Sequence, residues 1–257
     1  MKTLLMLLFL PILLLAKNPF EKKLPFKEAI VEYSLAGNKK GVETLYIKEY
    51  GKQRVIYENT NSKIISKDKE QLKIITPKWT YTISKNSDIA KRVPNLNYLL
   101  YIRFKELKKD EQKKVLENLK IINYLPIQGS RFKIVRDHTS INNISCDLLI
   151  QKSKRECYSY KGSLLLKSEI KFLGFNNSKI LTNIFKTKVD PKLFDISDYK
   201  IVDDKVKSVQ EYEKSKKIID FLKRNLNKKT IFIKAKNLHD YNQDIQDGIK
   251  ALETIKQ

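Results

Sequence analysis

The stretch Trp79-Thr80-Tyr81-Thr82-Ile83-Ser84 decides the fold class of this chain, because apolar and hydroxyl side chains alternate along it without a break. A period of two residues is typical of a β-strand with one buried face, since successive side chains of a strand point to opposite faces of the sheet. We therefore expect Trp79, Tyr81 and Ile83 to face the interior and the hydroxyl groups to face outward.

Similar short runs, separated by brief turns, extend on both sides of this stretch to about residue 190. They cover residues 29–35, 43–47, 54–60, 72–75, 132–135, 144–150, 156–160, 164–173 and 179–189. Consecutive strands with short turns pair antiparallel, because parallel pairs need long crossover connections. The expected fold is mainly antiparallel β, a curved sheet or half-barrel with helices on its concave face and a C-terminal helical extension.

Two helical segments interrupt the strands and form an insertion over about residues 95–122. Leu96, Leu99, Leu100, Phe104 and Leu107 recur at helical spacing, and a second apolar stripe ends at Ile122. Asp110 is the expected N-cap of the second helix. We expect this insertion to bury its apolar stripe against the concave face of the sheet.

The C-terminal extension, residues 201–257, is predicted to contain two amphipathic helices. The first begins at about Asp203 and carries a net positive charge, and the second covers residues 238–257 with a net negative charge. Opposite charges favour an antiparallel helical hairpin, while residues 230–236 between them fit either a strand or a loop. The extension docks on the sheet or on a partner, and partial docking on the sheet is favoured because two helices alone bury little apolar surface.

Residues 1–16 resemble a secretory signal peptide. One lysine precedes an apolar run of about a dozen residues, which is too short to span the hydrocarbon core of a bilayer, and Ala16 is a small residue suited to cleavage. The alternative is an uncleaved anchor. With cleavage, the mature chain comprises a β half-barrel domain over residues 17–200 and the extension, and we expect a periplasmic protein without a stable membrane span.

The composition excludes several classes of function. The 52 Lys and Arg against 29 Asp and Glu give a net charge of +23, but only seven of the 52 are Arg and they are spread along the chain. Proteins that read nucleic acid favour clustered Arg, so we expect no nucleic-acid partner. Two His and two Cys leave few ligands for a metal or haem site, so no cofactor and no metal is expected.

Catalytic motifs are also missing from the sequence. Asp137-His138-Thr139-Ser140 contains the residue types of a catalytic triad, but triads assemble from distant segments, so a polar turn is the preferred interpretation. No phosphate-binding glycine loop, zinc-protease helix or nucleophile elbow occurs. We therefore expect a protein that is not an enzyme, with no catalytic residues.

Cys146 and Cys157 are the only cysteines. If residues 150–153 form a hairpin with a two-residue loop, the two cysteines lie directly opposite each other, at a Cα separation of roughly 4.5–5.5 Å that suits a disulfide. Free thiols and a redox pair are the alternatives, but a redox pair usually has the Cys-X-X-Cys spacing. A structural disulfide is the favoured prediction.

Several short motifs resemble an uncharacterised family of bacterial periplasmic proteins. They are Gly41-x-Glu43-Thr44-Leu45-Tyr46-Ile47, Thr76-Pro77-x-Trp79-x-Tyr81-x-Ile83, Cys157-x-x-Tyr160-Lys161-Gly162-x-x-Leu165 and Asp190-Pro191-x-Leu193-Phe194. That family is similar in fold to the outer-membrane-lipoprotein carriers, half-barrels closed by helices. The resemblance covers about residues 26–196 and implies a carrier-like apolar cavity.

Two functions are therefore compared. In the first, the exported protein binds or carries an apolar ligand or acyl chain in the cell envelope, with lipid, an acyl chain or a lipoprotein as partner and Trp79, Tyr81, Leu100 and Phe104 as ligand-binding residues. In the second, the half-barrel is a protein-interaction scaffold with a packed core, and residues 201–257 bind another envelope protein. An empty apolar cavity favours the first function, and a solid core favours the second.

Overall fold

The computed structural model describes residues 18–21, 23–62, 67–127, 132–172 and 174–232. The expected signal peptide and the expected second helix of the extension lie outside these residues. The first helix of the extension and the whole strand pattern lie largely within them.

Twelve strands form one open sheet in the order β12-β6-β5-β4-β3-β2-β1-β11-β10-β9-β8-β7. Their bounds are β1 (Ala29–Gly37), β2 (Lys39–Lys48), β3 (Gln53–Ser62), β4 (Lys67–Ile75), β5 (Trp79–Ser84), β6 (Ile89–Pro94), β7 (Lys133–Ile141), β8 (Ile144–Gln151), β9 (Lys154–Ser159), β10 (Leu164–Phe172), β11 (Phe175–Phe185) and β12 (Lys200–Asp203). All neighbours are antiparallel except β12 and β6, which run parallel. The prediction of a mainly antiparallel β fold is confirmed.

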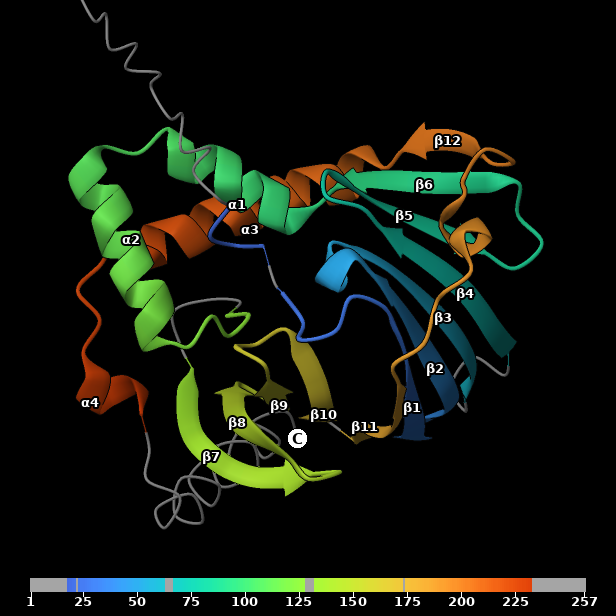
Figure 1. Cartoon of the computed structure of the whole chain (residues 1–257), viewed down its shortest axis with the longest axis horizontal. Helices are drawn as coiled ribbons and strands as arrows, with labels where there is room; N and C mark the ends of the chain where they lie inside the picture. Colours follow the sequence, from blue (N-terminus) through green and yellow to red (C-terminus); the bar gives the residue numbers. More distant parts are fainter. Residues whose placement is uncertain (1–17, 22, 63–66, 128–131, 173, 233–257) are drawn as a thin grey trace, which may run out of the picture.

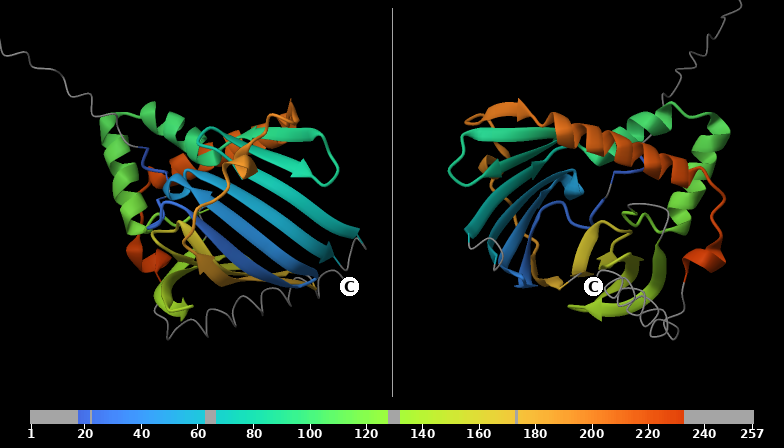
Figure 2. Two further views of the ribbon diagram at one scale, coloured as in Figure 1. Left: turned by 45° about the vertical axis from the view of Figure 1, so that its right-hand side comes forward. Right: turned by 180° about the vertical axis from the view of Figure 1, so that it is seen from behind.

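The sheet is curved, and helices lie across its open side (Figure 1). They are α1 (Leu96–Lys105), α2 (Lys109–Ile121), α3 (Lys205–Leu222) and the short α4 (Lys228–Ile231), with 3-10 turns η1 (Glu49–Gly51) and η2 (Pro191–Phe194). Figure 2 shows α1 and α3 side by side above the strands, and the two helices contact each other extensively. The arrangement is a half-barrel covered by helices.

The start of the extension differs from the prediction, because residues 200–203 are a strand rather than loop or helix. This strand, β12, pairs with β6, and Arg92 Nε and Nη2 donate hydrogen bonds to the Asp203 carboxylate at 2.7 and 3.1 Å. The extension therefore begins as the edge strand of the same sheet. Neither β6 nor β12 was expected from the sequence.

The helix starts follow local capping chemistry. Asn95 caps α1 by accepting a hydrogen bond from the Asn97 amide, and Asp204 caps α3 through the Lys207 amide. Asp110 is not the N-cap of α2 as predicted; Lys108 holds that position, and Asp110 lies in the first turn. A carboxylate there still stabilises the helix through its dipole, which is why the residue signals a helix start without capping it.

The described part of the extension docks on the half-barrel, as favoured. Ile218, Ile219, Phe221 and Leu222 of α3 are buried in one core cluster with residues of α1 and α2. The first half of α3 remains exposed, with Val206 and Val209 at 70% and 62% exposure. The apolar burial of this helix is therefore concentrated in its second half.

The insertion packs mainly on α3 rather than directly on the sheet. Phe104 packs edge to face against Phe20 with ring centroids 6.0 Å apart, inside the cluster that contains the buried end of α3. The sheet joins this cluster through Ile134 of β7 and Leu149 of β8. The expectation that the stripe rests on the concave face thus holds only at this end of the sheet, because α1 packs chiefly against α3.

The disulfide between Cys146 and Cys157 is confirmed, with a Cα separation of 5.4 Å. The predicted register is wrong, however, because the hairpin loop is Lys152-Ser153 and Cys157 lies opposite Leu148. Lys152 has a φ of 49°, so the tight turn falls one residue later than expected. The bond therefore joins diagonal positions of β8 and β9.

Candidate functional site

The two faces of the sheet carry different coverings. Residues directly opposite each other on paired strands point to the same face. Tyr81 pairs with Ile74, which pairs with Val55, and these three form a cluster with side chains of segment 190–199. We call this the outer face. Segment 190–199 crosses it in front of the strands in Figure 1.

Trp79 and Tyr81 belong to this outer cluster and face away from the cavities described below. Trp79 is half-buried, and the Arg92 guanidinium stacks on its ring at 4.3 Å from the centroid. Their predicted position in a concave ligand site is therefore wrong. Alternation identified the strand correctly, but the apolar face of β5 is buried by segment 190–199, and Thr80 and Thr82 point the other way.

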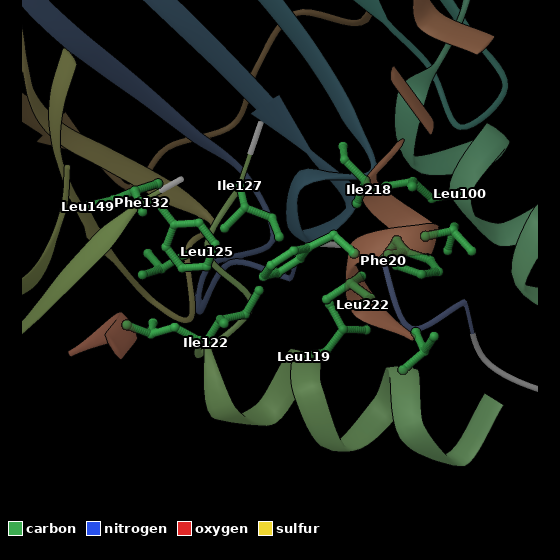
Figure 3. Packing of buried hydrophobic residues seen from close by; sticks show 14 of the residues in the cluster. Phe20, Leu100, Leu119, Ile122, Leu125, Ile127, Phe132, Leu149, Ile218 and Leu222 are labelled. Carbon is green, nitrogen blue, oxygen red and sulfur yellow. The ribbon is translucent and has the colours of Figure 1, made fainter. Parts of the chain in front are cut away.

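An apolar cavity of about 420 Å³ lies on the inner face, under the helices. Figure 3 shows side chains from α1, α2 and α3 converging there around Phe20. The apolar lining residues are Pro19, Phe20, Leu96, Leu100, Leu119, Ile122, Leu125, Pro126, Ile127, Ile218 and Leu222. Leu100 lines the cavity, whereas Phe104 is buried in the same core cluster and is not among the lining residues, so a ligand-binding role for either residue stays a prediction.

A second, polar cavity of about 350 Å³ adjoins the first. Arg54, Ile75, Thr80 and Val93 form its floor, and they share the inner face because they pair in succession across β3, β4, β5 and β6. The two cavities have Asn18, Glu21, Leu96, Asn97 and Lys214 in common. They therefore form one cleft between the helices and the sheet. The first cavity has more apolar lining residues, although Lys23 and Lys161 also line it, and the second has more charged ones.

Arg54 lies at the junction of the two cavities. Its Nε donates a hydrogen bond to the Gly51 carbonyl at 2.9 Å, and its Nη1 donates to the Ser163 carbonyl at 3.4 Å. Ser163 lines the apolar cavity, whereas Arg54 lines the polar one. Burial lowers the pKa of Arg54, an effect that the nearby Tyr33 hydroxyl opposes. No carboxylate among the described residues forms an ion pair with this guanidinium.

Lys73 is the second cation on the floor of the polar cavity. Its side chain keeps contact with solvent, yet desolvation by the surrounding protein lowers its pKa, and the carboxylate of Glu211 acts in the opposite direction. Within the described chain no carboxylate lies at ion-pair distance from its ammonium group.

The carboxylates of the polar cavity are held by other lysines. Lys52 Nζ lies 3.7 Å from Glu21 Oε1, and Lys214 Nζ lies 3.8 Å from Glu211 Oε1. Glu21 Oε1 is buried and accepts no hydrogen bond. The cavity thus contains two loose ion pairs and two further cations, Arg54 and Lys73, which leaves an excess of positive charge.

The sequence did not single out Arg54 or Lys73. The only available signal was that Arg54 precedes Val55 on β3 and Lys73 precedes Ile74 on β4, which places the two cations on the opposite face from these apolar residues. Many lysines of this chain occupy similar positions, so the signal has little power on its own.

The Asp137–Ser140 segment is a strand irregularity rather than the expected turn. It lies in β7, where the pairing with β8 shifts between Val135 and Thr139. Asp137 has a φ of 43°, and its carboxylate accepts a hydrogen bond from the Ser145 hydroxyl at 3.1 Å. Burial is the main cause of the lowered pKa of His138.

Two features are absent from the described ranges. These residues contain no group of three or more His, Cys, Asp or Glu side chains placed to hold a metal ion. None of the helices in the same ranges is both long and apolar enough to cross a bilayer.

Comparisons with known proteins give only distant similarities. The sequence matches neither a protein-family model nor a curated protein. An uncharacterized conserved protein from Thermus thermophilus is similar in structure, with a TM-score of 0.41 and 6% identity over 69% of this chain and 90% of that chain. A structure of PNGF-II has a TM-score of 0.40 and 11% identity over 74% of this chain, and this chain spans about a third of its length, 34%.

Proposed function

We propose that this protein binds or carries an apolar ligand or acyl chain in the cell envelope, using the cleft between its helices and its sheet. The apolar cavity on the inner face is the observation that supports this function. A fully packed core would leave no space of this size, so the cavity favours ligand binding over a scaffold with a solid core.

The size and lining of the cavity suit a small apolar molecule. Ligand sites typically enclose about 300–1,000 Å³ and are lined mainly by apolar side chains, as here. Each methylene transferred from water into such a site contributes about 0.8 kcal/mol, so roughly ten methylenes supply the free energy of micromolar binding before the cost of association. Helices α1 and α3 form the roof, so their movement is the route by which we expect a ligand to enter and leave.

The proposed location is the periplasm, after removal of residues 1–16. The Cys146–Cys157 disulfide supports export, because such bonds form and persist in oxidising compartments. The motifs that resemble the periplasmic carrier-like family support the same location and the same kind of ligand. Membership of that family is part of this proposal.

A partner-binding extension is the second candidate, and one observation favours it. Val206, Val209 and Tyr212 lie at helical spacing along the first half of α3 and are 70%, 62% and 49% exposed. An apolar stripe of this kind on a helix often marks an interaction surface. The two functions are compatible, since this stripe lies outside the residues that line the cleft.

A cavity-blocking variant tests the proposed function. Leu96 is half-buried at the start of α1 and lines both cavities, so Leu96→Trp places an indole in the cleft. Ile102 is exposed on the same helix, and Ile102→Trp is the matched control. Binding of a lipophilic naphthylamine dye, and its displacement by dodecanol, is measured by fluorescence for all three proteins.

The wild type and Ile102→Trp should bind the dye with micromolar affinity, and Leu96→Trp should bind at least roughly tenfold more weakly. Equal melting temperatures of the two variants exclude a loss through unfolding. Equal dye affinity in Leu96→Trp and the wild type would show that the probe binds elsewhere and would contradict the proposal.

A further inference from the structure

The charged end of the cleft determines what kind of apolar ligand fits. Arg54 and Lys73 lie diagonally on neighbouring strands of the inner face, since Arg54 pairs with Ile75 and Lys73 lies two residues before it. Both line the polar cavity, and neither forms an ion pair among the described residues. This pair is distinct from the residues that line only the apolar cavity.

We propose that Arg54 and Lys73 bind the anionic head group, a carboxylate or a phosphate, of an amphiphile whose chain occupies the apolar cavity. This inference rests on the proposed function and specifies its ligand class. A head group at Arg54 can continue directly into a chain in the apolar cavity, because the guanidinium bonds to the carbonyl of a residue that lines that cavity.

The free hydrogen-bonding capacity of Arg54 supports an anion. A guanidinium has five N–H donors, and two of them are used by the carbonyls of Gly51 and Ser163. Arg54 is half-buried and lines the polar cavity, so its remaining donors can reach a ligand there, and an opposite charge would offset its partial desolvation. A carboxylate or phosphate meets the planar donor array of Arg with two parallel hydrogen bonds.

The charges around the polar cavity leave its positive charge incompletely neutralised, which favours the binding of an anion. Glu21 and Glu211 are paired with Lys52 and Lys214, respectively, so they do not neutralise the floor of the cavity. The pKa of Lys73 is also lowered by the charges of Lys214 and Lys207 of α3 and raised by that of Glu43 of β2. The lowered pKa of Lys73 is consistent with a cation that has not met its counter-charge.

Three ligands that share a dodecyl chain but differ in head group distinguish the contribution of the head group to the affinity from that of the chain. Dodecanoate, dodecanol and dodecyltrimethylammonium displace the naphthylamine dye in parallel titrations, and inorganic phosphate tests an anion without a chain. Lys73→Gln removes one charge at an exposed position, Lys73→Arg retains it, and Lys40→Gln removes an exposed charge on β2 outside both cavities. Arg54→Gln is a second variant, checked for folding by circular dichroism.

We expect dodecanoate to bind roughly tenfold more tightly than dodecanol, and the ammonium compound to bind most weakly. Lys73→Gln should lower dodecanoate affinity by roughly tenfold without changing dodecanol affinity, Lys73→Arg should restore it, and Lys40→Gln should leave it unchanged. Arg54→Gln, if folded, should show the same selective loss.

The possible failures are distinguishable. If all three dodecyl ligands bind equally and Lys73→Gln has no effect, the head-group inference is wrong while the proposed function stands. If inorganic phosphate displaces dodecanoate at similar concentrations, the site binds a free anion rather than an amphiphile. If neither the dye nor any dodecyl ligand binds, the proposed function itself is wrong.

Discussion

Phe104→Ala tests the packing that closes the cleft. Phe104 is 6% exposed on α1 and lies in the core cluster that joins the three long helices to β7 and β8. Truncating a buried Phe typically costs about 3–5 kcal/mol, which combines lost burial with the space left behind. About 0.5–1.5 kcal/mol of this comes from the edge-to-face contact with Phe20. We expect a total loss of about 3–5 kcal/mol.

Urea unfolding measures this loss through two signals. Far-ultraviolet circular dichroism follows the helices and strands, and the emission of Trp79, the only tryptophan, follows the outer face of the sheet. Because Trp79 belongs to a different hydrophobic cluster from Phe104, coincident transitions indicate that the whole protein unfolds as one unit. Ile102→Ala, at an exposed position of the same helix, should cost less than about 1 kcal/mol.

A double-mutant cycle with Phe20→Ala isolates the aromatic contact. We expect a coupling energy of about 0.5–1.5 kcal/mol between the two substitutions, since their rings are in contact. A loss below about 1 kcal/mol for Phe104→Ala would refute the packing described here, because it would place Phe104 in a mobile or solvated environment. Zero coupling with an unchanged total loss would remove only the contact with Phe20.

Four further results are expected. Thiol titration of denatured, unreduced protein should find no free thiol, and Cys146→Ser with Cys157→Ser should lower stability by about 2.8 kcal/mol in the chain-entropy account. Truncation after residue 200 should lower the melting temperature and increase dye binding, because it removes the buried half of α3; unaltered melting would contradict docking. Trp79→Phe should leave ligand affinity unchanged, and dodecanol should not alter the emission of Trp79 in the wild type. Dodecanoate affinity should fall with rising pH and begin to do so below the usual lysine range, because the lowered pKa of Lys73 means that it loses its charge early.

The alternation of side chains predicted the strands but could not assign their faces. On β5, the sequence shows an apolar face with Trp79 and Tyr81 and a hydroxyl face, and the apolar face was assigned to the concavity. In the structure, segment 190–199 buries that face from outside. A pattern of period two predicts that one face of the strand is buried. It does not indicate which segment covers that face, and here the segment lies more than a hundred residues away in the sequence.

Strands whose pairing depends on distant partners were missed for a related reason. In β6 the charged Lys91 and Arg92 obscure the alternation, and β12 is only four residues long. The two strands stabilise each other through a parallel ladder and the Arg92–Asp203 ion pair. Neither strand has a strong local preference, so both follow from tertiary contact rather than from sequence pattern.

The polar end of the cleft illustrates what a sequence cannot show about charge. With 52 Lys and Arg in the chain, no single cation stands out, and most of them meet water or a carboxylate. Arg54 and Lys73 differ only because the fold places them on the inner face, under α3, while the carboxylates beside them are engaged by Lys52 and Lys214. Arg54 is half-buried and Lys73 keeps contact with solvent, and partial desolvation of such cations by the surrounding protein favours an opposite charge nearby. The two residues are therefore ligand candidates because neither has a carboxylate as an ion-pair partner among the described residues. Only the three-dimensional structure reveals this.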